Sequence, residues 1–477
     1  MEKLIGRESE KRILLDALQS EDSQLIAVIG RRRVGKTYLI RNVYKKQIIF
    51  EYSGEHTRNL KTQLLNFNLA LKDYSKSIKT ERKPENWTNA FDSLRKFISG
   101  KRTTGKKVVF LDEFPWIDTP RSGFLSAFEH FWNSWASRQE NLIIVICGSS
   151  ASWMIKKIVY SKGGLHNRIT CTIRLMPFNI KETEDYLRYK NSKLDHFQII
   201  QMYMILGGIP FYLKSIRAGE STMQFIDRLC FTREGILTNE FENLYKSLFS
   251  EAGHHISVVR ALAKHPEGME RDVLMSATGL KSGGRFTETL TELEESGFIS
   301  SYIPFGKTTK DKITKLIDEF SFFYLKFMEH KIITGKDTWI RLSSSNSWKI
   351  WSGFAWERVC LRHTEQIKKA LGISGVHSEQ GTWRSKGGKN KTRSQIDLYI
   401  DRKDNCINIC ELKFYDSGYA ITKDYAEALG RKLILFREHT KTNKTLFLTF
   451  ISARGIKSNK YSIALIQNSL TMDFLFL

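Results

Sequence analysis

The chain has 477 residues, of which 41% are hydrophobic and 26% charged, a balance ordinary for a folded globular protein and a length that suggests about three domains. The formal net charge is +24, and the surplus lies in residues 1–250 (+14) and 331–477 (+12). Such a surplus favours a polyanionic partner, whether nucleotide phosphates, nucleic acid or a membrane surface, although a generally basic proteome gives the same signal.

The same sequence argues against several classes of protein. No apolar run approaches the roughly 18–20 residues that span a bilayer, and the first ten residues are charged where a signal peptide would be apolar. The six cysteines form no CxxC pair, so we expect neither a zinc site nor a disulfide framework. We therefore expect a cytoplasmic protein without a membrane segment.

Three short apolar runs in the first part of the chain are typical of strands buried on both faces. The runs span residues 24–30, 107–112 and 142–147, and helical stretches separate them, for example 36–45, 58–75 and 122–138. Buried strands that alternate with helices indicate a parallel sheet covered on both sides. We expect an α/β core over residues 1–180 and a mostly helical segment over 181–250.

The next segment, residues 251–330, has the pattern of a winged helix followed by a packing connector. Helical patterns at 255–264, 271–278 and 285–295 precede two short strands within 298–315. The third helix carries four acids that DNA phosphates would repel, namely Glu288, Glu292, Glu294 and Glu295. We therefore interpret this module mainly as a packing or signalling element, although lysines of the hairpin can still reach a nucleic-acid backbone; these are Lys307, Lys310 and Lys312.

The last part, residues 331–477, predicts a further α/β domain. The expected order is helix, three strands, helix and strand, at 350–371, 374–384, 395–401, 406–414, 420–436 and 445–452.

A phosphate-binding loop follows the first apolar run. It consists of Gly30, Arg31, Arg32, Arg33, Val34, Gly35, Lys36 and Thr37, which match the Walker A pattern GxxxxGK[ST] without departure. The match lies between a strand and a helix, which is the context that the pattern requires. We expect Lys36 to contact the β- and γ-phosphates of ATP and Thr37 to bind Mg²⁺.

Polar residues at the ends of the other two apolar runs fit the same chemistry. Asp112 and Glu113 end the second run, so Asp112 is expected to hold Mg²⁺ through water and Glu113 to act as general base. Ser149 follows the third run and either senses the γ-phosphate or belongs to an ordinary turn.

These motifs resemble AAA+ and STAND-type ATPases. The resemblance rests on IGRESE at 5–10, GRRRVGKT at 30–37, LDEFPW at 111–116 and CGSS at 147–150. It implies that Arg168 contacts the γ-phosphate, in cis or across a subunit boundary of a homo-oligomer; the alternative is a solvated basic residue. Residues 207–210, GGIP, resemble the GGxP turn of the helical lid, which implies that Pro210 packs by the nucleotide base.

The order of all these segments resembles archaeal-type ATPases that are fused to a DUF234 C-terminal region. That region has its own candidate site. Glu411 and Lys413 share one face of a predicted strand because side chains alternate, and a hairpin can bring Asp397 beside them. Asp397 and Glu411 would bind Mg²⁺ or Mn²⁺, Lys413 would orient or deprotonate a water, and Glu357 could add a third acid from the preceding helix.

This pattern resembles the PD-(D/E)xK nucleases, with Ile396 where that pattern has proline. The loop before Asp397 carries five basic residues, Arg384, Lys386, Lys389, Lys391 and Arg393. They suit a clamp on a DNA backbone, or are the solvated tip of a hairpin.

The leading hypothesis is an ATP-driven machine with a fused metal-dependent DNA nuclease domain over residues 331–477, in which the nucleotide state controls nucleic-acid processing. The alternative is a regulatory ATPase whose C-terminal domain binds nucleic acid without cleaving it. A transcription regulator acting through the winged helix is a third class, and the acidic third helix argues against it.

Overall fold

The computed structural model describes residues 3–56, 59–75, 83–159, 163–165, 167–280, 283–329, 337–385 and 394–477. They form two compact units, unit 1 (Met1–Pro177) and unit 2 (Phe178–Leu477). Within the described ranges, no helix is both long and apolar enough to cross a membrane. Each unit is described separately below.

Unit 1 contains a five-stranded sheet in the order β2-β3-β4-β1-β5, with every neighbouring pair parallel. The strands are β1 (Gln24–Ile29), β2 (Ile48–Ser53), β3 (Lys107–Asp112), β4 (Leu142–Gly148) and β5 (Cys171–Arg174). β3 and β4 are buried at every position, which is why their sequences are continuously apolar. The expected parallel sheet is therefore present.

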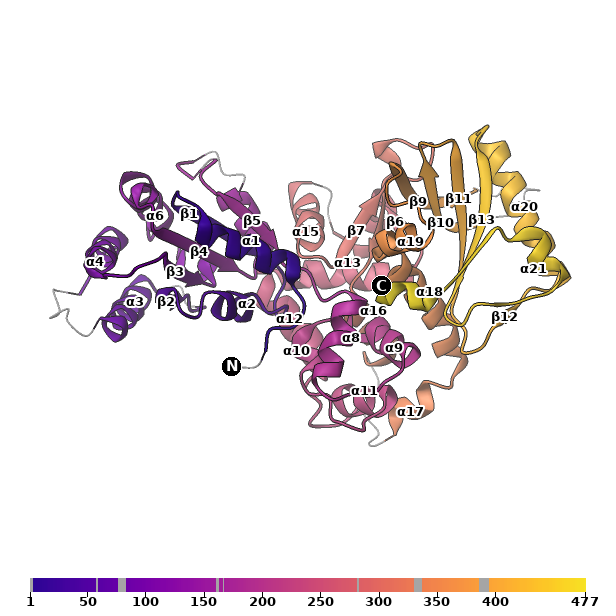
Figure 1. The fold of residues 1–477 in the computed structure, drawn as a ribbon, viewed down its shortest axis with the longest axis horizontal. Coiled ribbons are helices and arrows are strands. Elements are labelled where there is room, and N and C mark those ends of the chain that lie inside the picture. Colours follow the sequence, from indigo (N-terminus) through magenta and orange to yellow (C-terminus); the bar gives the residue numbers. More distant parts are fainter. Residues whose placement is uncertain are drawn as a thin grey trace. The chain divides into compact units, whose positions relative to one another are not determined.

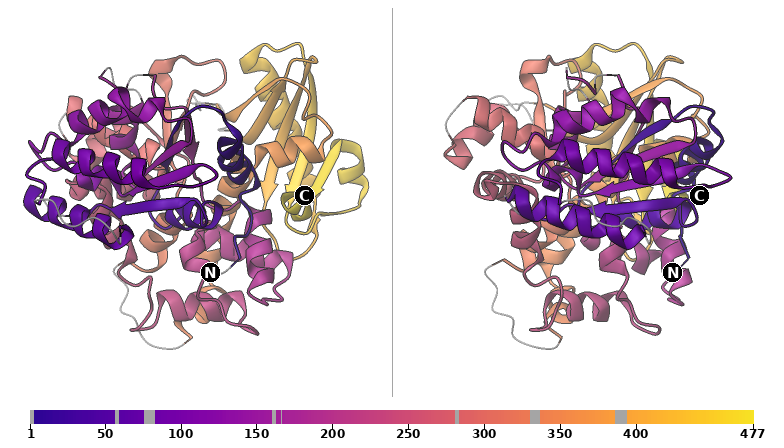
Figure 2. Two further views of the ribbon diagram at one scale, coloured as in Figure 1. Left: turned by 60° about the vertical axis from the view of Figure 1, so that its left-hand side comes forward. Right: turned by 90° about the vertical axis from the view of Figure 1, so that its left-hand side faces the viewer.

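Helices cover this sheet, and the strands lie between helical layers (Figure 2). The α-helices are α1 (Glu8–Gln19), α2 (Lys36–Val43), α3 (Leu60–Tyr74), α4 (Trp87–Gly100), α5 (Phe114–Ile117), α6 (Phe124–Ser134) and α7 (Ala151–Met154). A 3-10 helix spans Ala136–Arg138 and a π-helix Ile155–Val159. The core on one face is aromatic: Phe67 packs edge-on against Phe50 at 5.3 Å and against Trp87 at 5.5 Å between ring centres.

Unit 2 begins with five helices, α8 (Ile180–Tyr189), α9 (His196–Leu206), α10 (Pro210–Leu213), α11 (Thr222–Cys230) and α12 (Glu240–Leu248). The glycine pair between α9 and α10 is required by its surroundings. Gly207 and Gly208 both have positive φ, and a Cβ on Gly208 would lie 2.3 Å from the carbonyl oxygen of Phe178. The turn thus closes against the first residue of the unit, which donates its N–H to the Gly208 carbonyl at 2.9 Å.

The next elements follow the order of helices and strands that the sequence predicts for residues 251–330. They are α13 (Ala252–Lys264), β6 (Met269–Glu270), α14 (Arg271–Thr278), α15 (Gly284–Glu295), β7 (Ile299–Tyr302) and β8 (Ile313–Leu316). A 3-10 helix spans Thr309–Asp311 within the β7–β8 hairpin, and the three strands form an antiparallel sheet in the order β6-β8-β7. The connector holds α16 (Glu319–Phe327) and α17 (Thr338–Leu342), and its aromatic rings pack together, with Phe323 4.8 Å from Trp339.

The C-terminal part of unit 2 is built on a mixed sheet in the order β15-β13-β11-β10-β9. Its elements are α18 (Asn346–Arg362), α19 (Thr364–Ala370), β9 (Ser378–Arg384), β10 (Gln395–Arg402), β11 (Cys406–Lys413), β12 (Tyr419–Ala420), α20 (Lys423–Thr440), β13 (Thr445–Ser452), β14 (Ile456–Lys457), α21 (Lys460–Leu465), β15 (Asn468–Thr471) and a 3-10 helix, Met472–Phe476. β9, β10 and β11 are antiparallel, whereas β11, β13 and β15 are parallel. Leu429 and Phe436 of α20 belong to the core on one face, and α20 runs along the sheet (Figure 1).

Several boundaries in this part differ from the prediction, and the helix expected over 420–436 spans Lys423–Thr440. The single helix expected over 350–371 is two helices, because the backbone of His363 leaves helical geometry at φ −111° and ψ 33°. The strand expected from residue 374 begins at Ser378.

The β7–β8 hairpin packs against this C-terminal sheet. Phe305 lies 5.1 Å from Tyr399 and 5.4 Å from Phe436 between ring centres. Thr382 of β9 donates a hydrogen bond to the Tyr302 hydroxyl at 2.7 Å. The hairpin is thus engaged in packing through Tyr302 and Phe305.

Candidate functional site

The phosphate loop has the backbone that its glycines allow. Gly35 has φ +93° and precedes α2, where only glycine avoids strain. At Gly30 the restriction is space, because a Cβ would lie 2.4 Å from the Leu175 carbonyl oxygen. Arg33 also has positive φ, at +74°. Arg31, Val34 and Lys36 are buried, whereas Arg32 and Arg33 are partly exposed.

Lys36 and Thr37 connect this loop to the ends of β3 and β4. The Lys36 ammonium donates to the carbonyls of Gly30 at 2.8 Å and Arg31 at 3.1 Å, and to Ser149 Oγ at 3.2 Å. Thr37 Oγ1 donates to Asp112 Oδ2 at 2.7 Å. A hydroxyl and a carboxylate at one point are the oxygen ligands that Mg²⁺ accepts, so these two residues fit the expected cation.

Glu113 lies beside this pair in an unusual backbone conformation. Its φ of +44° and ψ of 46° place a non-glycine residue in the left-handed region, at the start of α5. Its carboxylate accepts from Ser149 Oγ at 2.7 Å and from the Ser149 N–H at 3.2 Å. Ser149 therefore contacts both Lys36 and Glu113, and its role at the γ-phosphate stays a prediction.

Asp112 has a further neighbour that the sequence did not suggest. The Cys147 thiol, at the end of β4, donates to Asp112 Oδ1 at 3.1 Å. Burial, together with Asp112, raises the pKa of this thiol well above its usual value. Cys147 thus stays a neutral donor that orients the carboxylate.

Arg7 is a second residue that the prediction omitted. It is only 4% exposed and donates to the Val34 carbonyl at 3.3 Å, so it supports the phosphate loop from behind. The signal was present, because Arg7 belongs to the IGRESE motif.

Arg168 lies at the other edge of the sheet. It precedes β5, whose last residue, Arg174, pairs with Ile29 beside the loop, while the Thr170 N–H is bonded to the Leu25 carbonyl. Because β1 and β5 are parallel, the exposed Arg168 lies several strand residues away from the loop. The predicted contact of Arg168 with the γ-phosphate, in cis or across a subunit boundary, stays a prediction.

Pro210 is the first residue of α10, in unit 2. Its predicted contact with the nucleotide base stays a prediction.

The C-terminal candidate site is centred on two adjacent strands. Leu398 pairs with Cys410 in the antiparallel β10–β11 register, which places Asp397 opposite Glu411 on one face. Both carboxylates are buried, and Asp397 Oδ2 accepts from the Leu412 N–H at 3.1 Å. The hairpin thus places Asp397 beside Glu411 and Lys413, as expected.

Glu411 is held by three donors. Lys413 Nζ lies 2.7 Å from one carboxylate oxygen, and the Tyr425 hydroxyl donates to the same oxygen at 2.6 Å. Lys432 Nζ lies 2.6 Å from the other oxygen. Burial alone would raise the pKa of Glu411, but Lys413 and Lys432 bring it below its usual value.

Tyr425 and Lys432 were not predicted. They lie seven residues apart on α20, which places them two turns apart on one helix face. The sequence shows the spacing of these two residues, but it does not show which strand this face of α20 contacts.

In the two other carboxyl groups, Asp397 and Glu357, the pKa is raised and not lowered. Burial, and then Glu411, raises the pKa of Asp397 to about 6. Burial, and then Asp397, raises the pKa of Glu357 to about 8. Among the described residues, no three His, Cys, Asp or Glu side chains form a ready metal centre. The carboxylates have the right chemistry for Mg²⁺ or Mn²⁺, but a cation at Glu411 would have to replace a lysine or Tyr425.

Of the predicted basic loop, residues 386–393 lie outside the described part of the chain. Arg384 is described and donates to the Glu267 carbonyl at 3.1 Å. It thus connects β9 to the segment between α13 and β6.

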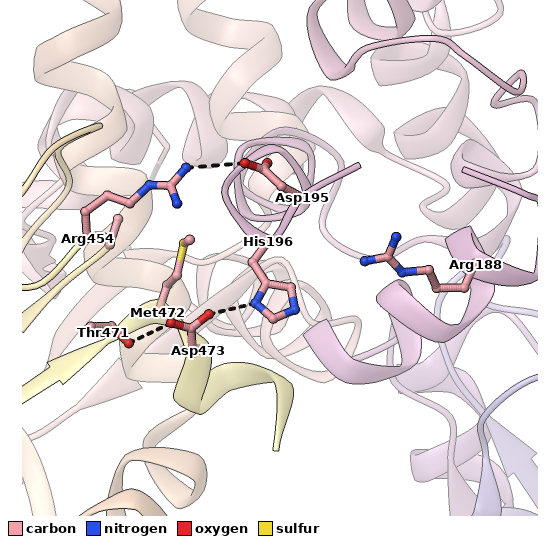
Figure 3. Close-up of a pocket in the computed structure, with 8 residues that line it drawn as sticks. Arg188, Asp195, His196, Arg454, Thr471, Met472 and Asp473 are labelled. Atoms are coloured by element: carbon pink, nitrogen blue, oxygen red, sulfur yellow. Dashed lines mark hydrogen bonds and ion pairs between the residues drawn. The ribbon is translucent and has the colours of Figure 1, made fainter. Parts of the chain in front are cut away.

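A separate pocket of about 440 Å³ lies in unit 2 between α8, α9 and the end of the chain. Figure 3 shows His196 directed at Asp473 and Arg454 directed at Asp195, at 2.7 Å and 3.3 Å. His196 also stacks on Phe476 at 3.7 Å between ring centres. These contacts tie the first helices of unit 2 to its last residues.

Comparison with known proteins identifies the N-terminal part. Residues 4–216 match the family model of an ATPase domain found predominantly in Archaea. The match includes the phosphate loop and the turn at 207–210. The N-terminal part of the chain is therefore similar to this ATPase domain, and its parallel sheet and phosphate loop form a P-loop ATPase-like core.

The chain is also similar to individual proteins. It is 23% identical over 437 residues to MJECL04, an uncharacterized protein of Methanocaldococcus jannaschii, with 90% of this chain and 91% of that protein covered. It resembles the Walker-type ATPase PABY2304 of Pyrococcus abyssi with a TM-score of 0.50 and 18% identity, covering 68% of this chain and 96% of the other. The ORC2 protein of Aeropyrum pernix, in ADPNP and ADP complexes, gives a TM-score of 0.39 and 14% identity over 67% of this chain and 91% of the other. The likeness to PABY2304 is one of fold.

Proposed function

We propose that the ATPase domain hydrolyses Mg²⁺-bound ATP with its catalytic residues at the ends of β3 and β4. Lys36 binds the β- and γ-phosphates, and Thr37 with Asp112 holds the cation. Glu113 accepts the proton of the attacking water, and Ser149 orients that carboxylate through two hydrogen bonds. Lys36→Ala should abolish nucleotide binding, measured by calorimetry with ATP and Mg²⁺. Binding at the wild-type affinity would contradict this assignment.

We further infer that the C-terminal part of unit 2 is a PD-(D/E)xK-like domain that cleaves DNA in a metal-dependent reaction under control of the nucleotide state. The observation that supports it most is the pairing of Asp397 with Glu411 on one face, with Lys413 beside Glu411. The chemistry supplied by a bound Mg²⁺ or Mn²⁺ is a water of lowered pKa and neutralisation of charge at phosphorus. Asp397 and one oxygen of Glu411 would hold the cation, and Lys413 would position the water.

The order of helices and strands in this part also supports the proposal. α18, β9, β10, β11, α20 and β13 follow one another in the order of that fold. Glu357 lies on α18, where burial and the nearby Asp397 carboxylate raise its pKa. Glu357 would therefore complete the acidic cluster. DNA is the proposed partner because residues 331–477 carry a net charge of +12.

The test is cleavage of duplex, branched and single-stranded DNA with Mg²⁺ or Mn²⁺, each with and without ATP. The wild type should cut at least one of these forms, and Asp397→Ala should not. A matched control is Asp404→Ala, because Asp404 lies in the β10–β11 turn away from the cluster. Equal cleavage by wild type and Asp397→Ala would mean that the activity arises elsewhere.

The second candidate function is a regulatory ATPase that binds nucleic acid without cutting it. The three donors on Glu411 favour it, because they already satisfy the carboxylate that a cation would need. Binding of DNA without cleavage under all these conditions is the outcome that this candidate predicts.

A further inference from the structure

A buried lysine of the β7–β8 hairpin lies beside the C-terminal carboxyl groups. Lys315, on β8, is only 8% exposed, and lysine is rarely buried without a partner for its charge. Its ammonium lies 5.2 Å from the centre of the Tyr302 ring. Apart from this ring contact, the Lys315 side chain has no hydrogen bond or ion pair with any residue that the structure describes.

The lysine is held in place by its surroundings. Gly268 has φ +92°, and a Cβ there would lie 2.7 Å from Lys315 Cγ, so a larger residue would displace the lysine stem. Arg358 Nε donates to the carbonyl of Leu316, the next residue of β8, at 2.8 Å. On the other side, the Tyr302 hydroxyl is bonded to β9 through Thr382. These contacts hold β8 against α18 and the neighbouring strand β7 against β9.

The charged groups around Lys315 are of both signs. Glu357 and Asp397 attract the ammonium, whereas Arg384 and Arg358 repel it. The Glu357 carboxyl group has no hydrogen bond or ion pair with the described residues, and the Asp397 carboxylate accepts only from the Leu412 N–H. The ammonium and the two carboxyl groups are therefore near one another, but none of them has a directly bonded partner of opposite charge among the described residues.

We propose that Lys315 binds a phosphodiester oxygen of DNA at the C-terminal site, while the neighbouring carboxylates bind a divalent cation. This inference rests on the proposed function of that site and assigns a residue of the hairpin to it. A phosphodiester supplies a directly bonded anion for the Lys315 ammonium, and a cation supplies a directly bonded partner for the Glu357 and Asp397 carboxylates. The cation reduces the repulsion between the carboxylates and the phosphodiester, and the phosphodiester reduces the repulsion between Lys315 and the cation. DNA and the cation should therefore bind more tightly together than apart.

The test compares variants of the full chain in binding a fluorescent DNA oligonucleotide, measured by anisotropy in EDTA and in Ca²⁺. Ca²⁺ should tighten binding by the wild type. Lys315→Met should lose about 10- to 100-fold of the affinity measured in Ca²⁺, the range for a hydrogen bond between charged groups. Lys326→Met is the matched control, because Lys326 is an exposed lysine of α16. Equal affinities for Lys315→Met and Lys326→Met in Ca²⁺ would overturn the proposal.

DNA binding is measured without cleavage, so failure of the Lys315 proposal is distinguishable from failure of the proposed nuclease activity. If the wild type cuts no DNA but Lys315→Met weakens DNA binding in Ca²⁺, the role of Lys315 in binding is supported and the nuclease activity is contradicted. A second measurement uses the wild type and does not depend on the folding of a variant. Acylation of amines, followed by mass spectrometry, should modify Lys315 in the free protein and not in the protein with DNA and Ca²⁺, with the exposed Lys326 as the internal reference. Modification of Lys315 that is absent, or unchanged by DNA and Ca²⁺, would contradict the proposal.

Discussion

Replacing Glu113 by glutamine isolates the chemical step of ATP hydrolysis. Glutamine has the same shape, and its amide can keep contacts with the Ser149 N–H and hydroxyl, which now lie 3.2 Å and 2.7 Å from the carboxylate. The Thr37–Asp112 hydrogen bond and the Lys36 contacts involve other atoms, so ATP binding should remain. What is lost is the acceptor for the proton of water.

Loss of a general base costs about 10²- to 10⁴-fold in rate, which corresponds to roughly 3–5 kcal/mol in activation free energy. We therefore expect Glu113→Gln to bind ATP at the wild-type affinity, measured by calorimetry, and to hydrolyse it at least ~10²-fold more slowly, measured by phosphate release. Glu140→Gln is the control, because Glu140 is exposed at the edge of the sheet where β4 begins. Hydrolysis by Glu113→Gln at the wild-type rate would refute the role of this residue.

Further predictions concern subunit contacts, pH and salt. If Arg168 acts across a subunit boundary, mixing Arg168→Ala with Lys36→Ala chains should partly restore ATP hydrolysis, and no restoration at any protein concentration would exclude that role. Burial raises the pKa of Glu357 from 4.5 to about 8, so the folded chain binds this proton more tightly than the unfolded chain. The free energy of unfolding should therefore fall as the pH rises from 4.5 to about 8. Thermal melts in EDTA should show a smaller fall for Glu357→Gln; an identical pH profile would contradict the burial argument. DNA affinity should drop steeply between ~50 and ~200 mM salt, and a flat dependence would exclude phosphate contacts as the main source of binding.

The parallel sheet of unit 1 was predictable where strands are buried on both faces. β1, β3 and β4 therefore read as continuous apolar runs. The two outer strands were missed. β5 has only four residues, of which one is fully buried, and β2 is buried at two of six positions, so neither has a continuous apolar pattern.

The missed strand also left the position of Arg168 open. Because β5 runs parallel to β1, the segment before β5 lies toward the end of the strands opposite to the phosphate loop.

The site residues that were predicted belong to short local patterns. Thr37 follows from the loop itself, and Asp397, Glu411 and Lys413 follow from strand alternation and a hairpin. Residues supplied by distant elements were missed, because tertiary packing alone brings them to the site. Lys432 comes from α20 and Lys315 from the β7–β8 hairpin, almost 100 residues before Glu411.

The most direct test of the whole account is the rate of plasmid cleavage in Mn²⁺ with no nucleotide, with ATP, and with a non-hydrolysable ATP analogue. The account predicts cleavage that depends on Asp397 and whose rate differs between these nucleotide conditions in the wild type. In Lys36→Ala the three rates should be equal, because that chain does not bind nucleotide. Cleavage at one rate in all conditions would contradict control by the ATPase domain, and no cleavage in any of them would contradict the nuclease assignment.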